Sequence, residues 1–514
     1  MGVIAAGHEL TVHVAEEILR SGGNAFDAAV GAHLAACITE PVLSSLAGGG
    51  FLLAREADGY ERLYDFFAQT PLRRRKQNET DFFPISADFG ETQQEFHIGM
   101  GAFATPGTVK GVYAIHRDLC TMPMKRLVEP AVRLARDGVT MNHFQAYILD
   151  VVSPVFTAFD DSLKVYGSKE KPGKLVQEGD VLRIPGFADF LEVLALEGED
   201  LFYRGEVAQQ VDRFSKEHAG HVTRDDFLAY EVTRRKPLMV NYRNARLAVN
   251  PAPSSGGTLI AFALKLMEES DPDAHPFGTS GHLRSLALAQ QLTDAARIDF
   301  LINHGLTAPG EAILEPDYVS RFRRNMREHP RFPRGTTHIS IMDNQGNTAA
   351  LSTSNGEGCG HLIPGTGIMM NNMLGEEDLH PDGFAMWPEN HRITSMMAPA
   401  ILSMADGSEV ALGSGGSNRI RTAILQVLLN LTDYRMSLRD AVSRPRIHCE
   451  KDFLSVEHGF DNDQLIPVLE AWPNHKRWSR SNLFFGGTHS VMRGPDGFQG
   501  AGDPRRGGVA KVVI

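Results

Sequence analysis

The chain has 514 residues, and its 42% hydrophobic and 22% charged residues are ordinary for a globular protein with a large core. A formal net charge of −12 argues against a surface for nucleic acid or for an anionic membrane. No run of about 18 apolar residues predicts a membrane span, and the four cysteines lack the spacing of a metal site. The start, MGVIAAGHEL, lacks signal-peptide features, so we expect a cytoplasmic protein unless a leader was trimmed.

The first 335 residues predict helices that alternate with short strands. Asn24, with Asp27 three residues later, is typical of a helix start. Two apolar runs around residues 57–59 predict a hairpin, whereas the polar segment 68–103 predicts a long excursion over the surface. The helices expected here are 9–20, 24–35, 107–138, 187–196, 206–217, 258–268 and 282–302, and the strands are 51–54, 63–67 and 238–249. The charged segment 315–334 predicts an exposed linker.

A β-hairpin is predicted directly after that linker. Ile339 and Ile341 share one face of the first strand, and residues 344–346 are a turn signal. The return strand runs from residue 348 to Ser354, and the spacing places Ser354 opposite Thr336. Further along, we expect strands at 367–372, 401–404 and 410–412, a helix at 419–432 and a hairpin turn at 494–497.

A threonine at the start of such a strand can act as a nucleophile after self-cleavage. The Thr336 hydroxyl would attack the carbonyl of Gly335, and hydrolysis of the resulting ester would make Thr336 a new N-terminus. A free α-amine titrates near pH 7.7–8.0 and can serve as the base for the neighbouring hydroxyl. On the hairpin alone, an ordinary buried β-hairpin is the simpler explanation of these residues, so the rest of the chain has to decide.

The string GTTHISIMDNQGN (335–347) resembles the start of the small subunit in the gamma-glutamyltranspeptidase family of N-terminal-nucleophile (Ntn) hydrolases. Seven further segments resemble family motifs in the same order, from one end of the chain to the other. They are GGNAFDAAV (22–30), EPVLSSLAGGGFLL (40–53), ATPGTVKGV (104–112), PAPSSGG (251–257), GIMMNNML (367–374), GSGGSNRI (413–420) and GAGDPR (500–505). On these matches the chain is identified as a member of the family.

The resemblance implies roles for residues around the hairpin. Thr336 matches the nucleophile, and cleavage would fall between Gly335 and Thr336. Ser354 stands where the family has a threonine that hydrogen-bonds the nucleophile. Gly416 and Ser417 match the paired glycines whose N–H groups form an oxyanion hole, and a glycine-rich turn before a helix suits this role independently.

The resemblance is weaker where relatives hold the α-carboxylate of a γ-glutamyl group. Phe67 stands where the family has an arginine. Of the family's two serines, one is kept as Ser395 and the other is replaced by Met396. Arg505, Arg392 or the basic run 73–76 could supply the missing cation. Alternatively, Phe67 and Met396 could line a more apolar acyl pocket.

The groups that bind the α-amine in the family are also mostly changed. Their positions hold Gly356, Met373 and Glu376, and only Glu376 keeps the chemistry. Met373 could line the same apolar pocket or belong to the core. We therefore expect altered binding of the acyl donor.

The family implies an α+β fold, a four-layer αββα sandwich formed jointly by residues 1–335 and 336–514. It also implies an autocatalytically cleaved zymogen that acts as an acyltransferase or hydrolase in glutathione metabolism. The substrate would be a small amide such as glutathione, the partner would be the chain's own second fragment, and no metal or cofactor is expected. Two alternatives stay open: an acylase of the cephalosporin-acylase kind acting on another amide, and an uncleaved, non-catalytic scaffold relative.

Overall fold

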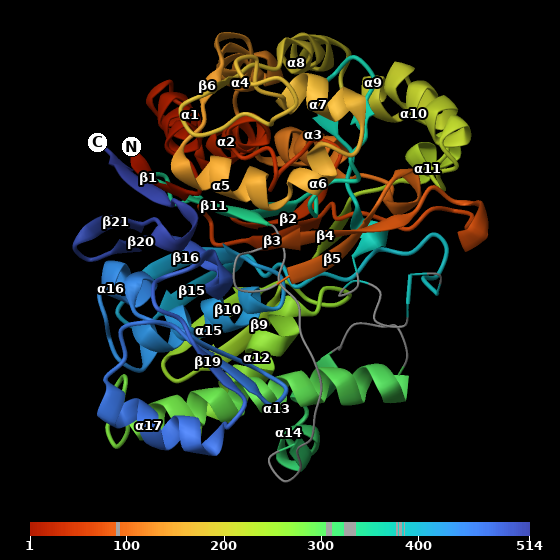
Figure 1. Ribbon diagram of the computed structural model, residues 1–514. Coiled ribbons are helices and arrows are strands. Elements are labelled where there is room, and N and C mark those ends of the chain that lie inside the picture. The colour runs from red at the N-terminus through yellow and green to blue at the C-terminus, as the bar shows by residue number, and fades with distance from the viewer. Residues whose placement is uncertain (89–92, 305–310, 323–335, 377–378, 380–382, 385) are drawn as a thin grey trace.

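Two antiparallel sheets form the centre of the computed structural model, which describes residues 1–88, 93–304, 311–322, 336–376, 379, 383–384 and 386–514 (Figure 1). The seven-stranded sheet has the order β22 (Val509–Val513), β1 (Gly2–Ala6), β11 (Thr337–Asp343), β12 (Thr348–Ser354), β2 (Gly49–Arg55), β3 (Glu61–Asp65) and β8 (Thr233–Arg235). The six-stranded sheet has the order β21 (Gly497–Ala501), β20 (Gly487–Gly494), β16 (Glu409–Gly415), β15 (Ala400–Met404), β10 (Ala245–Val249) and β9 (Leu238–Tyr242).

Helices cover the outer faces of both sheets, as Figure 1 shows for α2 and α4 on one side and α12 and α13 on the other. The layer on the seven-stranded sheet and its outer shell contain α1 (Glu9–Arg20), α2 (Ala25–Thr39), α3 (Thr108–Leu119), α4 (Met124–Asp137), α5 (His143–Val151), α6 (Ser153–Phe156), α7 (Asp160–Tyr166), α8 (Pro185–Glu197), α9 (Asp200–Tyr203), α10 (Glu206–Glu217) and α11 (Arg224–Ala229). The layer on the six-stranded sheet contains α12 (Gly256–Met267), α13 (Ser280–His304), α14 (Pro316–Phe322), α15 (Arg419–Thr432), α16 (Leu438–Ser443) and α17 (Asn462–Ala471). The predicted mixture of helix and sheet, an α+β fold, is confirmed.

Short strands complete the structure at the edges of these layers. They are β4 (Phe83–Asp88) with β5 (Gln93–Ile98), β6 (Val139–Thr140) with β7 (Val181–Leu182), β13 (Leu362–Ile363) with β14 (Ile368–Met369), and β17 (Ile447–Glu450) with β18 (Phe453–Val456) and β19 (His475–Arg477).

Local sequence signals explain several of these elements. Asn24 caps α2 by accepting hydrogen bonds from the N–H groups of Phe26 and Asp27, and Asp27 completes a capping box. Ile339 and Ile341 of β11 point into the core beneath α2, as their alternation predicts. His338, on the other face, is fully buried and lies within hydrogen-bonding distance of both Ser340 and Ser352.

The core is divided by the seven-stranded sheet. One cluster of buried apolar side chains fills the space between this sheet and α1–α4. A second cluster fills the space between the two sheets and beneath α12, α13 and α15. Because side chains alternate across a strand, β1 contributes Ile4 to the first cluster and Val3 to the second.

Four parts of the sequence-based prediction need correction. The helix expected over 107–138 is two helices, α3 and α4, and the strand expected over 238–249 is a hairpin of β9 and β10.

The other two corrections concern segments expected to lie on the surface. Residues 68–103 are not only a surface excursion, because β4 and β5 form a hairpin in which Phe96 and Ile98 are fully buried. In the expected linker 315–334, α14 occupies residues 316–322, and residues 323–334 lie outside the described part of the chain.

Each sheet contains strands from residues 1–335 and strands from residues 336–514. In the seven-stranded sheet, β11 pairs with β1 on one side and with β12 on the other, and β12 then pairs with β2. In the six-stranded sheet, β10 pairs with β15. Residues 1–335 and 336–514 therefore both contribute to each sheet and to each of the two clusters of buried side chains.

Candidate active site

The hairpin formed by β11 and β12 brings Thr336 close to Ser354. Thr337 pairs with Thr353, so the next positions toward the open end of the hairpin are Thr336 and Ser354, in the predicted register. Both are largely buried, with 5% and 6% of their surfaces exposed. Ser354 Oγ accepts a hydrogen bond of 3.0 Å from the N–H of Gly356. Gly335 lies outside the described residues.

A glycine-rich turn packs directly on the nucleophile candidate. Strand β16 ends at Gly415, and a Cβ atom added there would collide with the carbonyl of Thr336. Gly416 and Ser417 follow with φ angles of +123° and +53°, and α15 begins at Arg419. Ser417 thus adopts a left-handed conformation that favours glycine. The turn places backbone amides at the start of a helix beside Thr336, which suits the stabilisation of an oxyanion.

These residues share one small pocket, which we call the reaction pocket. Its volume is about 30 Å3. The residues that line it are Phe67, Thr336, Ser354, Met373, Glu376, Leu379, Ser395, Met396, Met397, Ser417 and Ile420. The structure therefore brings together the candidate nucleophile, its partner hydroxyl, one residue of the oxyanion turn and five of the six predicted substrate-binding residues. Gly416 lies beside the pocket, next to Ser417.

The reaction pocket is mostly apolar. Phe67 forms one wall and stacks on Phe51 with ring centroids 5.6 Å apart. Methionine, leucine and isoleucine side chains form most of the remainder, and Glu376 is the charged group among the lining residues. No lysine or arginine belongs to this described lining. An α-carboxylate bound here would therefore lack the cationic partner that such groups usually have.

The segment PAPSSGG supports one wall of the reaction pocket. Ser254 Oγ donates a hydrogen bond of 2.8 Å to the carbonyl of Ser395, and the Ser255 N–H donates to the same oxygen at 2.9 Å. The Ser395 hydroxyl accepts a bond from the Met397 N–H at 3.1 Å. This segment, residues 251–257, thus fixes the strand of chain that carries Ser395 and Met396.

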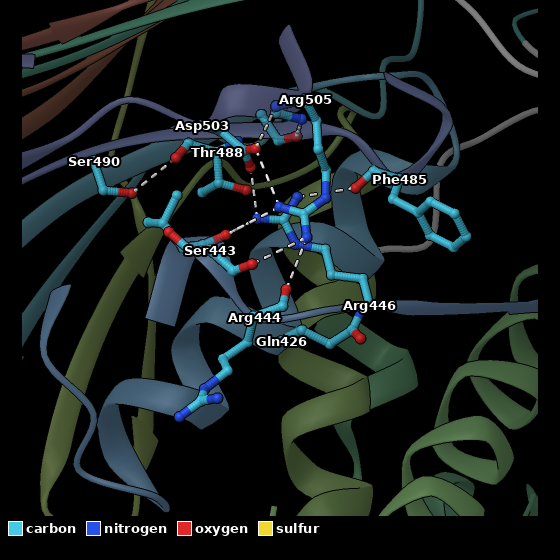
Figure 2. Close-up of polar contacts among 12 residues, drawn as sticks. Gln426, Ser443, Arg444, Arg446, Phe485, Thr488, Ser490, Asp503 and Arg505 are labelled. Carbon is cyan, nitrogen blue, oxygen red and sulfur yellow. Dashed lines mark hydrogen bonds and ion pairs between the residues drawn. The ribbon is translucent and has the colours of Figure 1, made fainter. Parts of the chain in front are cut away.

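Arg505, a predicted substrate-binding residue, lies elsewhere. Its side chain is almost fully buried and forms an ion pair with Glu457 at 2.6 Å. It forms a second ion pair with Asp503 at 3.1 Å (Figure 2). Arg446 pairs with the other oxygen of Asp503 at 2.6 Å. Although burial alone would raise the pKa of Asp503, Arg446 and Arg505 hold it well below its usual value. Arg505 is therefore committed to a buried charge cluster and does not line the reaction pocket.

The other arginines considered from the sequence are also engaged away from the pocket lining. Arg392 donates hydrogen bonds to the carbonyl of Phe67 and to the hydroxyl of Tyr230, and its Nε lies 3.5 Å from Asp65. The Arg392 side chain therefore holds the backbone of Phe67 in place and does not line the reaction pocket. Residues 74–76 of the basic run line a different pocket.

Two residues near Thr336 were not recognised from the sequence. Glu40 is 1% exposed, and its Oε2 accepts a hydrogen bond of 2.7 Å from the Thr337 hydroxyl. Burial raises the pKa of Glu40 to about 7, although the Thr337 bond and the charge of Arg506 act in the opposite direction. Arg506 donates to the carbonyl of Thr336 at 3.3 Å. Glu40 is the first residue of the motif EPVLSSLAGGGFLL, and Arg506 directly follows the motif GAGDPR. A charged residue in or beside a family motif was the sequence signal that could have identified both.

The described residues form neither a metal site nor a helix that could span a membrane. No group of three or more His, Cys, Asp or Glu side chains in that part of the chain could hold a metal ion. All four cysteines are free. No described helix is long and apolar enough to cross a membrane.

Known proteins resemble this chain over nearly its full length. The sequence pattern of the family described as gamma-glutamyltranspeptidase matches residues 11–513. A "glutathione hydrolase proenzyme" from Escherichia coli (strain K12) is 30% identical, over 98% of this chain and 90% of that protein. An "acylase ACY 1 proenzyme" from Pseudomonas sp. (strain SE83) is 28% identical, over 96% of this chain and 90% of that protein.

Solved structures agree with this relationship. A cephalosporin acylase from Bacillus halodurans superimposes with a TM-score of 0.85 at 22% identity, covering 99% of this chain and 95% of that one. The gamma-glutamyltranspeptidase of Helicobacter pylori gives a TM-score of 0.53 at 28% identity, over 61% of this chain and 88% of that one. The chain is therefore an enzyme of the Ntn amidohydrolase and acyltransferase class, and it belongs to the gamma-glutamyltranspeptidase family.

Proposed function

We propose that this enzyme cleaves its own chain before Thr336 and then uses Thr336 to form an acyl-enzyme from an amide substrate. The observation that carries the proposal is that Thr336, Ser354 and Ser417 line one pocket. A threonine hydroxyl, a second hydroxyl and a helix-start turn are the parts that an N-terminal-threonine hydrolase needs.

Self-cleavage would proceed by transfer of the acyl group from nitrogen to oxygen. The Thr336 hydroxyl oxygen bonds to the carbonyl carbon of Gly335, the bond to the Thr336 nitrogen breaks, and the hydroxyl proton passes to that nitrogen. Water then hydrolyses the ester, which leaves a carboxylate on Gly335 and a free amine and hydroxyl on Thr336. The resulting fragments, 1–335 and 336–514, would stay together as a heterodimer because their strands share both sheets.

Substrate turnover repeats the same chemistry on another amide. The α-amine of Thr336 takes the proton of the neighbouring hydroxyl, whose oxygen attacks the substrate carbonyl. In this proposal the Gly416 and Ser417 amides stabilise the oxyanion, and Ser354 orients the nucleophile. The amine leaves with the proton, and water or a second amine then releases the acyl group.

The pocket favours an acyl group that is more apolar than γ-glutamyl. Phe67, Met373 and Met396 line it, and its described lining offers no cation for an α-carboxylate. This supports an acylase acting on a non-γ-glutamyl amide. The competing substrate class is a γ-glutamyl amide such as glutathione, which relatives named glutathione hydrolase favour and for which Glu376 and Ser395 could still provide polar contacts.

The intact mass under denaturing conditions tests the central proposal. Wild-type protein should give two fragments that meet between Gly335 and Thr336, and Thr336→Ala should give one. Thr336→Ser keeps a hydroxyl and should still cleave, and Thr337→Ser is the matched control. A wild-type chain that stays whole after long incubation would refute the proposal.

Acyl anilides then separate the two substrate classes. Hexanoyl p-nitroanilide carries an apolar acyl group, whereas γ-glutamyl p-nitroanilide carries the α-carboxylate and α-amine. We expect the higher kcat/KM for the hexanoyl compound. A clear preference for the γ-glutamyl compound would instead assign the enzyme to glutathione-like substrates.

A further inference from the structure

A second, larger pocket is not used by the proposed reaction. Its volume is about 390 Å3, within the range of about 300–1,000 Å3 that is usual for small-molecule sites. We call it the basic–aromatic pocket, because Arg74, Arg75 and Lys76 line it together with Phe82, Phe384 and Trp387. Thr336 does not belong to its lining.

Cations outnumber carboxylates around this pocket. Arg75 and Lys76 are exposed, and Lys76 lies 3.7 Å from Glu79 in a pair that is itself solvent-exposed. Arg74 lies over the ring of Trp387, with its guanidinium carbon 5.7 Å from the ring centroid. The carboxylate among the lining residues is Glu389. In a chain with a net charge of −12, this local excess of positive charge predicts an anionic ligand.

The opposite part of the lining is aromatic and held in place by packing. Phe82 stacks on His97 with centroids 4.6 Å apart, and the Phe384 ring lies 5.3 Å from Phe82. Trp387 is only 4% exposed and meets His221 edge to face at 5.2 Å. The half-buried rings of Phe82 and Phe384 can contact an aromatic group of a ligand, and the covered Trp387 ring supports them from the pocket lining.

His221 adds a neutral polar group between these two parts. Burial, with Arg75 and Arg74 acting in the same direction, lowers the pKa of His221 to about 4. Its Nδ1 accepts a hydrogen bond of 3.0 Å from the Arg75 N–H, so the proton of the neutral ring is on Nε2. The ring therefore anchors the basic segment without adding a charge.

We propose that the basic–aromatic pocket binds a small organic anion that carries an aromatic ring. The cationic side would contact the anionic group, and the half-buried rings of Phe82 and Phe384 would contact the aromatic group close to Trp387. A carboxylate and a phosphate share this chemistry, because both accept charge-assisted hydrogen bonds from arginine. The site is separate from the acyl-enzyme chemistry, so it stands or falls independently of the proposed function.

Fluorescence of the purified full-length protein tests the proposal. The chain has three tryptophans, and Trp387 is the one in this pocket. Titration with benzoate should give a saturable change that Trp387→Phe removes. Benzyl alcohol has the ring alone and acetate the charge alone, so both should bind at least about tenfold more weakly. Phenyl phosphate, titrated in parallel, shows which anionic group is preferred.

Charge variants locate the site. The double variant Arg75→Gln, Lys76→Gln changes two exposed side chains and should bind benzoate about tenfold more weakly. Arg439→Gln, at another exposed arginine, is the control and should bind like wild type. Isothermal titration calorimetry repeats the measurement without relying on tryptophan. Absence of saturable heat with both benzoate and phenyl phosphate, or equal affinity in the double variant, would overturn the proposal.

Discussion

Glu40 allows a quantitative prediction about stability and pH. Its carboxyl group is buried beside Thr337, and burial raises its pKa from 4.5 to about 7. Between these two pH values the unfolded chain has lost the proton while the folded chain still holds it. The unfolded state therefore binds fewer protons, and stability contributed by this group falls as pH rises through that window.

The size of the effect follows from the width of the window. One bound proton is worth about 1.36 kcal/mol for each pH unit, so the interval from 4.5 to about 7 corresponds to about 3 kcal/mol. Glu40→Gln keeps the shape of the side chain and removes its titration. The free energy of unfolding of the variant, minus that of the parent, should therefore rise by about 3 kcal/mol from pH 4.5 to pH 8.

Urea unfolding at a series of pH values provides the assay. It is best done in the Thr336→Ala background, in which both proteins should remain single chains. Thr337→Val removes the hydrogen bond that lowers the pKa of Glu40, so it should extend the window to higher pH. A difference between Glu40→Gln and its parent that stays constant or falls with pH would refute the reasoning.

Substitutions at three other positions have expected outcomes. Ser417→Gly should preserve stability, because the φ of +53° at this position suits glycine. Ser417→Val should lower the free energy of unfolding in urea by about 1–3 kcal/mol. Equal stability of the two variants would contradict this view of the turn. Arg505→Met should destabilise the protein by about 3–5 kcal/mol, because Glu457 and Asp503 lose a buried partner. Thermal denaturation should therefore show a lower Tm. An unchanged Tm would show that the charge cluster does not stabilise the fold. Phe67→Leu reshapes one wall of the reaction pocket and should lower kcat/KM for hexanoyl p-nitroanilide by about tenfold, so full retained activity would place the acyl group elsewhere.

The sequence predicted well those features that depend on local pattern. The alternation around Ile339 and the turn at residues 344–346 predicted the β11–β12 hairpin and its register. The cap at Asn24 and the glycine turn before Arg419 likewise marked helix starts that the structure confirms. Matches to a known family then placed residues from distant segments in one pocket.

Features that depend on distant partners could not be predicted in the same way. Arg505 looked available for a substrate carboxylate, but its charge is used by Glu457, 48 residues away in the sequence. Glu40 lies 297 residues from Thr337, so nothing local indicated that its carboxyl group would be buried there. Phe96 and Ile98 stand in a polar segment, and their burial comes from packing that spacing alone does not reveal.

The position of β1 in the seven-stranded sheet also affects how the protein can fold during its synthesis. Residues 2–6 leave the ribosome before their partners, because β11 and β22 follow roughly 330 and 500 residues later. Because synthesis adds about 5–20 residues per second, β1 lacks both neighbouring strands for tens of seconds. Its unsatisfied backbone groups meanwhile remain open to wrong pairing, so we expect newly made chains to depend on chaperones until residues beyond β11 have emerged.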